Sequence, residues 1–216
     1  IFTVHSSKLN SYMPDSTFLT KLMYAKSHKI VAITKKMQHM IEEKHGLKNV
    51  TTIYNSIDIK AIQEKAKEAI NIDFDFIIAV GQYATNVKQF DKLIYAYSQS
   101  ILPSKNIHLV ILGEGALESQ LKKIANQNGV NNKLHLLGYK NNPYKYIQQA
   151  KFYVLTSKLE GMPMVLLEAL TCGTPIVSFD CKTGPSEIVK HKENGLLVED
   201  QNVPMLIEQM NLFVTD

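Results

Sequence analysis

Residues 152–180 read FYVLTSKLEGMPMVLLEALTCGTPIVSFD, and this stretch decides the fold. The apolar runs FYVLT and TPIVSF are rich in aromatic and β-branched residues and predict two buried strands. Between them Pro163 is expected in the first turn of an apolar helix over 164–172, and Gly173 is expected to end that helix in a left-handed conformation. A strand, a loop, a helix and a second strand in this order form the repeating unit of a parallel α/β sheet.

The same alternation of short apolar runs and longer amphipathic stretches continues in both directions along the chain. It is typical of βα units that pack on a parallel sheet. The expected strands are 1–4, 29–34, 50–54, 74–80, 108–112, 134–137, 152–155, 175–179 and 195–198. The fold class is therefore α/β, with a doubly wound, Rossmann-like parallel sheet.

An alanine- and lysine-rich stretch, IKAIQEKAKEAI at 59–70, divides the strands into two groups. The group before it is too small for a complete doubly wound sheet, whereas the group after it holds about six strands. The chain also opens inside an apolar segment, IFTVH, so we expect a preceding part of the first domain. We predict a remnant of a first Rossmann-like domain at 1–55, a linker at 56–72 and a nearly complete second domain at 73–216.

Composition limits the function classes. The 24 basic residues are all lysines and face 20 acidic residues, for a net charge of +4. This excess fits a phosphate-bearing small molecule or light contact with an anionic membrane, but it forms no dense basic stripe of the kind that binds nucleic acid. The two cysteines, Cys172 and Cys181, provide neither a disulfide framework nor a zinc motif, which favours a reducing cytoplasmic compartment.

Two carboxylates stand out in the 152–180 stretch. Glu160 lies on the loop after the first strand, and Glu168 lies in the apolar helix. Ligands of open α/β sheets bind beyond the carboxyl ends of the strands, and a helix start there favours phosphate. A carboxylate among apolar neighbours needs hydrogen-bond donors, which ribose or sugar hydroxyls would supply. The alternative is that Glu168 faces solvent and Glu160 is an ordinary loop residue.

The segment EGMPMVLLEALTCGTPIVS at 160–178 resembles the signature of the family-four retaining glycosyltransferases, which have two glutamates with seven residues between them and a two-domain GT-B fold. Four further segments resemble the same family in the same order. They are ITKKMQHMIEEKHGLKNVTTIYNSID at 33–58, AVGQYATNVKQFDKLIYAY at 79–97, VILGEGALESQLKKIA at 110–125 and TGPSEIVKHKENGLLVED at 183–200. Within the family, the chain looks most like bacterial surface-polysaccharide enzymes.

The resemblance implies roles for the two glutamates. Glu168 would accept hydrogen bonds from the nucleotide ribose, and Glu160 would hold the transferred sugar as a catalytic residue. Backbone amides of the segment that opens the helix would hold the distal phosphate; its residues are Gly161, Met162, Pro163, Met164 and Val165. No metal is then expected, and the sequence shows neither a DxD pair near a strand end nor histidines at metal-ligand spacing.

The loop after strand 74–80 departs from the family. There Gly81 is followed by Gln82, where the family has an arginine that grips the diphosphate, and Lys88 supplies the family's lysine. Since Gln82 carries no charge, the phosphates would depend more on Lys88 and on the helix dipole. The alternative for Lys88 is an ordinary surface lysine.

The remaining expected site residues surround the nucleotide and the sugar. Gly113, Glu114 and Gly115 resemble the family's glycine turn beside the nucleotide, although such glycines often serve only tight turns. Gly138 and Tyr139 fall where the family contacts the base, with a surface tyrosine as the alternative. His5 matches a histidine that reaches the cleft from the acceptor side, and a purely structural histidine is its alternative. The resemblance implies that His5 and Lys88 are catalytic residues together with Glu160.

The resemblance therefore predicts a cytoplasmic enzyme that moves a sugar from a nucleotide-diphosphate donor, UDP-linked in our prediction, to a glycan or lipid-linked acceptor. Peripheral contact with the inner membrane face is a further expectation. A binding module with little catalysis and a nucleotide-sugar epimerase of the same architecture are the alternatives. A dehydrogenase would need GxGxxG after a first strand, and VGQYATN does not supply it.

Overall fold

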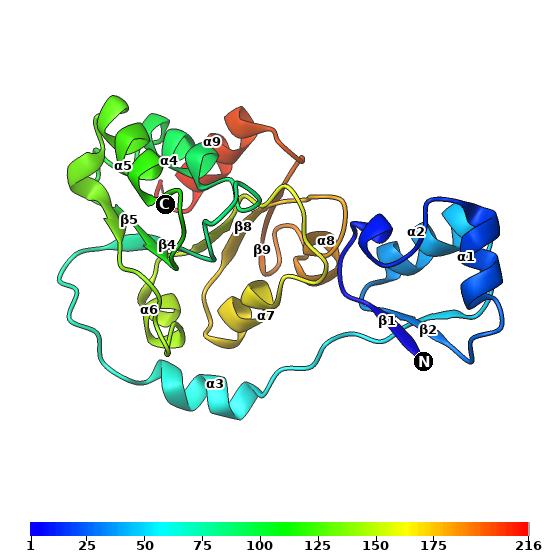
Figure 1. The fold of residues 1–216 in the computed structure, drawn as a ribbon. Helices are drawn as coiled ribbons and strands as arrows, with labels where there is room; N and C mark the ends of the chain where they lie inside the picture. The colour runs from blue at the N-terminus through cyan, green and yellow to red at the C-terminus, as the bar shows by residue number, and fades with distance from the viewer. Residues whose placement is uncertain (216) are drawn as a thin grey trace.

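The chain forms two parallel β-sheets, each with its own helices (Figure 1). The structure, a computed structural model, describes residues 1–215. All nine expected strands are present, and each begins and ends within two residues of its predicted bounds. The prediction of an α/β fold with a doubly wound parallel sheet is confirmed.

The first sheet is small and covered by two helices. Its strands are parallel in the order β1-β2-β3, namely β1 (Phe2–Val4), β2 (Ile30–Ala32) and β3 (Val50–Thr52). The short 3-10 helix η1 (Leu9–Ser11) and the helices α1 (Thr17–Tyr24) and α2 (Lys35–His45) connect the strands. Met37 and Ile41 of α2 pack with Val4 of β1 in one core, so the position of α2 and that of β1 are linked.

The second sheet has six parallel strands in the order β6-β5-β4-β7-β8-β9. These are β4 (Phe76–Val80), β5 (His108–Leu112), β6 (Leu134–Leu136), β7 (Tyr153–Leu155), β8 (Ile176–Phe179) and β9 (Gly195–Val198). From β4 the chain adds strands on one side, and after β6 it returns to the centre and adds strands on the other side. The topological switch point therefore lies between β4 and β7.

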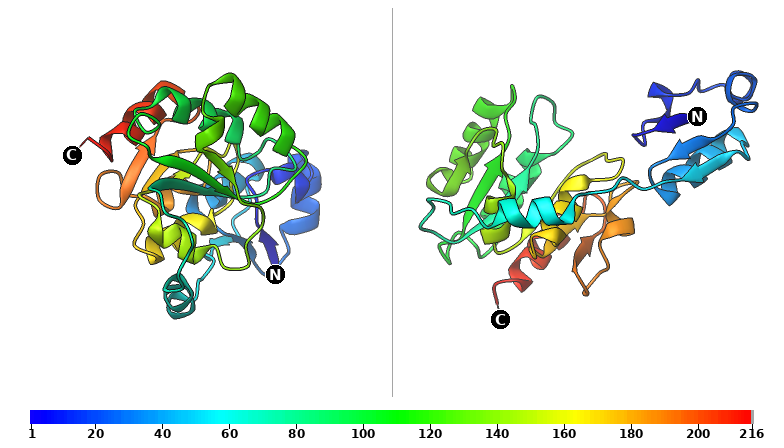
Figure 2. Two further views of the ribbon diagram at one scale, coloured as in Figure 1. Left: turned by 90° about the vertical axis from the view of Figure 1, so that its left-hand side faces the viewer. Right: turned by 90° about the horizontal axis from the view of Figure 1, so that it is seen from below.

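Helices cover both faces of this sheet (Figure 2). They are α3 (Ile59–Ala66), α4 (Phe90–Gln99), α5 (Glu118–Gln127), α6 (Tyr144–Gln149), α7 (Met164–Thr171), α8 (Pro185–Ile188) and α9 (Val203–Leu212), with a 3-10 helix η2 (Asn131–Lys133). On β4, Ile77 and Ala79 face α4, α5 and α9, while Phe76 and Ile78 face α3, α6 and α7. Both faces are thus buried, which explains why the strands read as continuous apolar runs.

Helix α3 lies inside the predicted linker at 56–72 but is a packed element. Ile62 and Ala66 are buried in the core that α6 and α7 share with the six-stranded sheet. The extended segments on either side of α3 complete the crossing from β3 to β4, as Figure 1 shows. None of the helices within residues 1–215 is both long and apolar enough to cross a membrane.

The two central strands are joined by only one ladder pair. Ile78 opposite Tyr153 is the pair that connects β4 to β7, whereas five pairs connect β4 to β5. The buried Tyr153 hydroxyl donates to the carbonyl of Val80 at 3.2 Å and accepts from the amide of Val80 at 3.2 Å. Burial raises the pKa of this phenol, so it stays protonated and continues the link where the ladder ends.

Glycines let the loops at the carboxyl edge of the sheet pack backbone against backbone. A Cβ on Gly113 would lie 2.0 Å from the carbonyl oxygen of Gly81, and one on Gly115 would lie 2.1 Å from the carbonyl carbon of Tyr83. Gly113 also has a φ of +138°. The turn after β5 therefore requires glycine to touch the loop after β4.

This contact predicts different costs for two Gly→Ala substitutions. We expect Gly129→Ala, with a φ of +70° and open space around it, to lower the free energy of unfolding by about 1 kcal/mol. Gly113→Ala should lower it by more than about 4 kcal/mol, since backbone must move. Urea unfolding of both variants measures this difference. Equal midpoints would contradict the close packing of these loops.

Candidate functional site

The loops that follow β4 and β7 meet at the switch point and bring a cation and a carboxylate together. Lys88 Nζ lies 2.7 Å from Glu160 Oε1. The Lys88 side chain is 24% exposed and that of Glu160 is 12% exposed, so the pair lies at the surface of the sheet edge but is largely shielded from water. These two expected site residues are therefore neighbours, although 72 positions separate them in the sequence.

The position of Lys88 is fixed by its backbone and by a glycine. Gly81 leaves room for the Lys88 side chain, because a Cβ there would lie 3.0 Å from Lys88 Cε. The Thr156 hydroxyl, just beyond β7, donates to the carbonyl of Lys88 at 2.8 Å. The amide of Lys158 donates to the carbonyl of Val87 at 2.9 Å. The lysine loop is thus tied to the glutamate loop by backbone contacts as well as by charge.

The Glu160 loop is held from both parts of the molecule. The carbonyl of Glu160 accepts a hydrogen bond from Ser7 Oγ at 2.8 Å and another from Thr183 Oγ1 at 2.6 Å. Ser7 follows β1 of the small sheet, and Thr183 follows β8 of the large one. Gly161 lies so close to His5 that a Cβ would be 2.3 Å from the His5 carbonyl oxygen. The exposed His5 is therefore brought next to the Glu160 loop.

Helix α7 begins directly after this loop. The helix starts at Met164, as predicted, and Pro163 is its N-cap residue, one position before the first turn in which it was expected. Proline has no N–H, so Pro163 offers no amide to an anion, whereas Met164 and Val165 carry first-turn amides that have no acceptor within the helix. Gly173, with a φ of +78°, follows the end of the helix as expected.

Glu168 lies on α7 and is half-buried. Burial raises the pKa of its carboxyl above the ordinary value. A carboxylate that loses water without gaining a hydrogen-bond donor is destabilised, which is the physical cause of this shift. Hydroxyl donors from a bound molecule would restore the hydrogen bonds that Glu168 lacks.

The expected glycine turn lies on the rim of the site. The amide of Gly113 donates to the carbonyl of Gly138 at 2.9 Å, and the amide of Tyr83 donates to the carbonyl of Glu114 at 3.0 Å. The turns after β4, β5 and β6 therefore lie side by side. Tyr139 is 66% exposed. Within residues 1–215, neither its side chain nor that of the exposed Gln82 hydrogen-bonds to the site.

Three residues that hold the site were missed in the sequence. Ser7, Thr156 and Thr183 each place a backbone carbonyl of Lys88 or Glu160. Hydroxyl residues are common in loops, and their partners are distant in the sequence, so no local pattern identifies them. In the described part of the chain no three His, Cys, Asp or Glu side chains gather closely enough to hold a metal ion.

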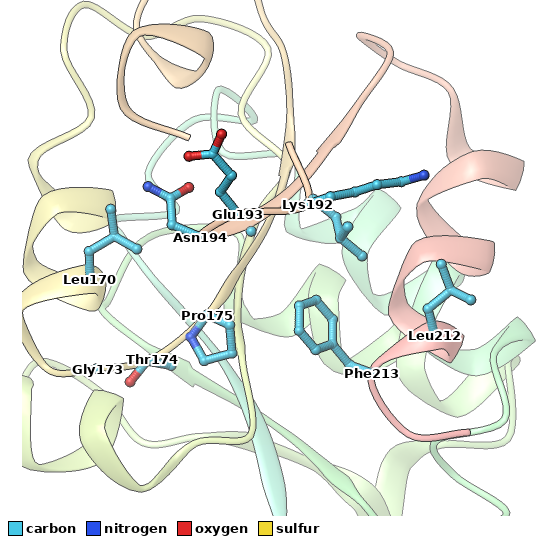
Figure 3. A pocket seen from close by; sticks show the side chains of 11 residues that line it. Leu170, Gly173, Thr174, Pro175, Lys192, Glu193, Asn194, Leu212 and Phe213 are labelled. Carbon is cyan, nitrogen blue, oxygen red and sulfur yellow. The ribbon is translucent and has the colours of Figure 1, made fainter. Parts of the chain in front are cut away.

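A cavity of about 720 Å³ lies elsewhere in the molecule (Figure 3). It is found at the amino ends of β8 and β9, between Pro175 and Phe213, at the edge of the sheet opposite the Lys88 and Glu160 loops. Ligands of doubly wound sheets bind at the carboxyl edge. We therefore assign the functional site to the switch point and not to this cavity.

Comparison with known proteins identifies relatives. Residues 60–216 match the family described as glycosyl transferases group 1. The N-acetylgalactosamine-N,N'-diacetylbacillosaminyl-diphospho-undecaprenol 4-alpha-N-acetylgalactosaminyltransferase of Campylobacter jejuni is 33% identical over 201 residues, which are 92% of this chain and 54% of the relative. The poly(ribitol-phosphate) alpha-N-acetylglucosaminyltransferase of Staphylococcus aureus is 25% identical over 174 residues, covering 81% of this chain and 34% of the relative. The chain thus spans about half or less of the length of these curated relatives.

Solved structures share the fold. Anabaena HepE in complex with UDP superposes with a TM-score of 0.82 at 18% identity, over 99% of this chain and 62% of that one. Staphylococcus aureus TarM in a complex that includes UDP gives a TM-score of 0.79 at 20% identity, over 99% and 43%. The superposition extends over nearly the whole of this chain, so the expected fold is confirmed. From the family match and the Campylobacter relative, the chain belongs to the glycosyl transferases group 1 family.

Proposed function

We propose that the protein containing this chain is a retaining glycosyltransferase that moves a sugar from a nucleotide-diphosphate donor, most simply a UDP-sugar, to a glycan or lipid-linked acceptor without a metal. The observation that carries the proposal is the Lys88–Glu160 pair at the switch point. The printed names support the two substrate classes: HepE and TarM were solved with UDP, and the Campylobacter relative is named for a diphospho-undecaprenol acceptor.

The donor diphosphate would bind where positive charge is available. Lys88 contributes a full charge, and the first-turn amides of α7 contribute the positive end of an eight-residue helix. These groups are already in place and need no reorganisation when negative charge develops on the departing diphosphate. In this arrangement they supply the electrostatic stabilisation for which other enzymes use a metal ion.

The sugar would lie between Glu160 and His5. The Ser7 and Thr183 hydroxyls donate to the Glu160 carbonyl, so the backbone from which the Glu160 side chain extends is fixed. As the bond from sugar to diphosphate breaks, the acceptor oxygen bonds to the same carbon on the same face, and a diphosphate oxygen takes the acceptor proton. Glu160 and His5 hold sugar or acceptor hydroxyls during this step, while Glu168 accepts from the ribose.

A nucleotide panel tests the donor site through thermal stability. A ligand at a hundredfold excess over its dissociation constant adds about 2.7 kcal/mol, which is roughly 5–10 °C in Tm for a chain of this size. We expect UDP to give this shift with EDTA present, and Glu168→Ala to remove most of it. Glu208→Ala, at an exposed position on α9, is the matched control.

The panel also separates the alternatives. A larger shift with GDP or ADP would mean that the base is not uracil. A shift that needs added Mg²⁺ would contradict metal-free binding. If no nucleotide stabilises the chain, the donor site is wrong. If UDP stabilises the chain but the full-length protein transfers no sugar, the binding-module alternative is favoured. The absence of a cation at Gln82 would then explain the lack of transfer.

A substitution at Lys88 tests the phosphate role separately from the fold. Lys88→Gln should weaken UDP by about 10-fold to 100-fold, because a charge-assisted hydrogen bond is lost, and should leave the weaker binding of uridine unchanged. Isothermal titration calorimetry of both ligands measures this. Lys158→Gln, at an exposed lysine on the neighbouring loop, should bind both as the wild type does. An equal loss of affinity for UDP and for uridine would show that Lys88 supports only the loop structure.

Peripheral contact with an anionic membrane is part of the proposal, and α1 is the surface that supports it. Its apolar side chains point outward: Phe18 is 75% exposed and Leu22 is 70% exposed, whereas the small polar Thr20 is buried. Residues 17–29, which hold α1 and the segment after it, contain three lysines, Lys21, Lys26 and Lys29, and no acidic residue. An exposed apolar helix face beside lysines is the arrangement that binds an anionic lipid surface.

Vesicle sedimentation tests this surface. We expect the chain to bind phosphatidylglycerol vesicles at low salt and to bind phosphatidylcholine vesicles weakly. Phe18→Ser with Leu22→Ser should reduce binding by about tenfold or more, while Tyr95→Ser, which removes an exposed apolar side chain on α4, should not. Undiminished binding of the double variant would exclude α1 as the membrane surface.

A further inference from the structure

The N-terminus of α2, in the small sheet, is capped by a side chain from the large one. Thr34, the N-cap residue, accepts from the amide of Met37 at 3.2 Å in the usual way. The next two amides, those of Lys35 and Lys36, donate to Glu187 Oε2 and Oε1 at 2.7 and 2.9 Å. Glu187 lies on α8, 152 and 151 positions later in the chain.

The same carboxylate holds the point where the chain leaves the first sheet. The Tyr54 hydroxyl donates to Glu187 Oε2 at 3.0 Å, and Tyr54 lies two residues beyond β3. Burial, and then the neighbouring Glu187 carboxylate, raise the pKa of the Tyr54 phenol, so the donor stays protonated. Lys36 Nζ lies 3.5 Å from Asp180 Oδ1. We call Glu187, Tyr54, Lys36 and Asp180 the interdomain clamp.

The interdomain clamp holds the start of α2 both by charge attraction and by the geometry of its hydrogen bonds. The start of α2 carries the positive end of an 11-residue helix, and a carboxylate is the group that this end favours. Two parallel bonds from adjacent amides to the two oxygens fix an orientation, which a single bond would leave free. The helix start therefore cannot rotate relative to α8 without breaking two charge-assisted hydrogen bonds.

A second set of contacts lies at the candidate site. Ser7 Oγ donates to the Glu160 carbonyl, and the His5 carbonyl packs against Gly161. Met162 contacts the core of the small sheet and one core of the large sheet. Since α2 and β1 share a core, holding α2 at the clamp also holds β1, and with it His5.

We propose that Glu187 is a positioning residue, which holds the two sheets in the arrangement that places His5 against the Glu160 loop. It makes no contact of its own with Lys88, Glu160 or Glu168 among the hydrogen bonds of residues 1–215. Its effect on the reaction is therefore indirect, through α2 and β1. The effect of Glu187 on sugar transfer rests on the proposed function. The effect of Glu187 on the arrangement of the two sheets does not.

Distance measurement between the two sheets tests the clamp without any need for activity. Spin labels are placed through Lys48→Cys, after α2, and Lys123→Cys, on α5, both exposed positions. We expect one narrow distance distribution in this background and a clearly broader or shifted one when Glu187→Gln is added. Glu187→Gln has nearly the same volume but loses the charge and turns an N–H₂ group toward an amide donor. Glu193→Gln is the control, at an exposed glutamate of the same sheet unit.

Nucleotide binding and sugar transfer complete the test. Glu187→Gln should bind UDP within a factor of about two of the wild type, yet transfer by the full-length protein should fall about tenfold or more, because the reacting groups are misplaced. If UDP binds neither the wild type nor Glu187→Gln, the proposed function is wrong. The spin-label distances still show whether Glu187 holds the two sheets in place. An unchanged distance distribution, or an equal loss of UDP binding and transfer, would overturn the positioning role. Should Glu187→Gln fail to fold, Tyr54→Phe, which removes one hydroxyl, takes its place with the same expected broadening.

Discussion

The return of the chain to the centre of the large sheet is the constraint on which the site depends. β4 and β7 are neighbours joined by one ladder pair and by the Tyr153 hydroxyl at Val80, so the loops that follow their carboxyl ends start side by side. Parallel strands on both sides of such a junction leave a crevice above it. Lys88 and Glu160 come from the two strands that border this crevice, and the turns after β5 and β6 complete its rim.

The Glu160 loop is where the two sheets depend on each other most closely. Its carbonyl is shared by a hydroxyl from each sheet, its next residue must be glycine to fit against His5, and Met162 contacts both cores. A carboxylate fixed in this way cannot adapt to a displaced partner. The charge of Lys88 compensates Glu160 in the absence of a ligand, and a bound diphosphate would compete for the same cation.

The sequence predicted the elements far better than the contacts between them. The strands of the large sheet could be read from their apolar runs because both faces of that sheet are covered. Gly173 ended its helix as expected because only a residue tolerant of positive φ fits there. The pairing of Lys88 with Glu160, of Ser7 with Glu160 and of Glu187 with α2 spans 72, 153 and 152 positions. Such pairings depend on strand order and loop conformation, to which no local spacing corresponds. The start of α7 at Met164 was predicted correctly, while Pro163 is the N-cap residue and not part of the first turn; helix ends are commonly uncertain by one residue.

The capping of α2 by Glu187 also affects the order in which the protein can be completed as it is made. The amides of Lys35 and Lys36 leave the ribosome about 150 residues before the carboxylate that they bind. At ordinary rates of synthesis this interval is roughly 8 to 30 seconds. During it the amides at the start of α2 and the Ser7 hydroxyl lack the partners that they have in the finished structure. The segment with α2 is thus synthesised well before the segment that caps it, and a ribosome that pauses between them prolongs the period in which these groups are open to chaperones and to other chains.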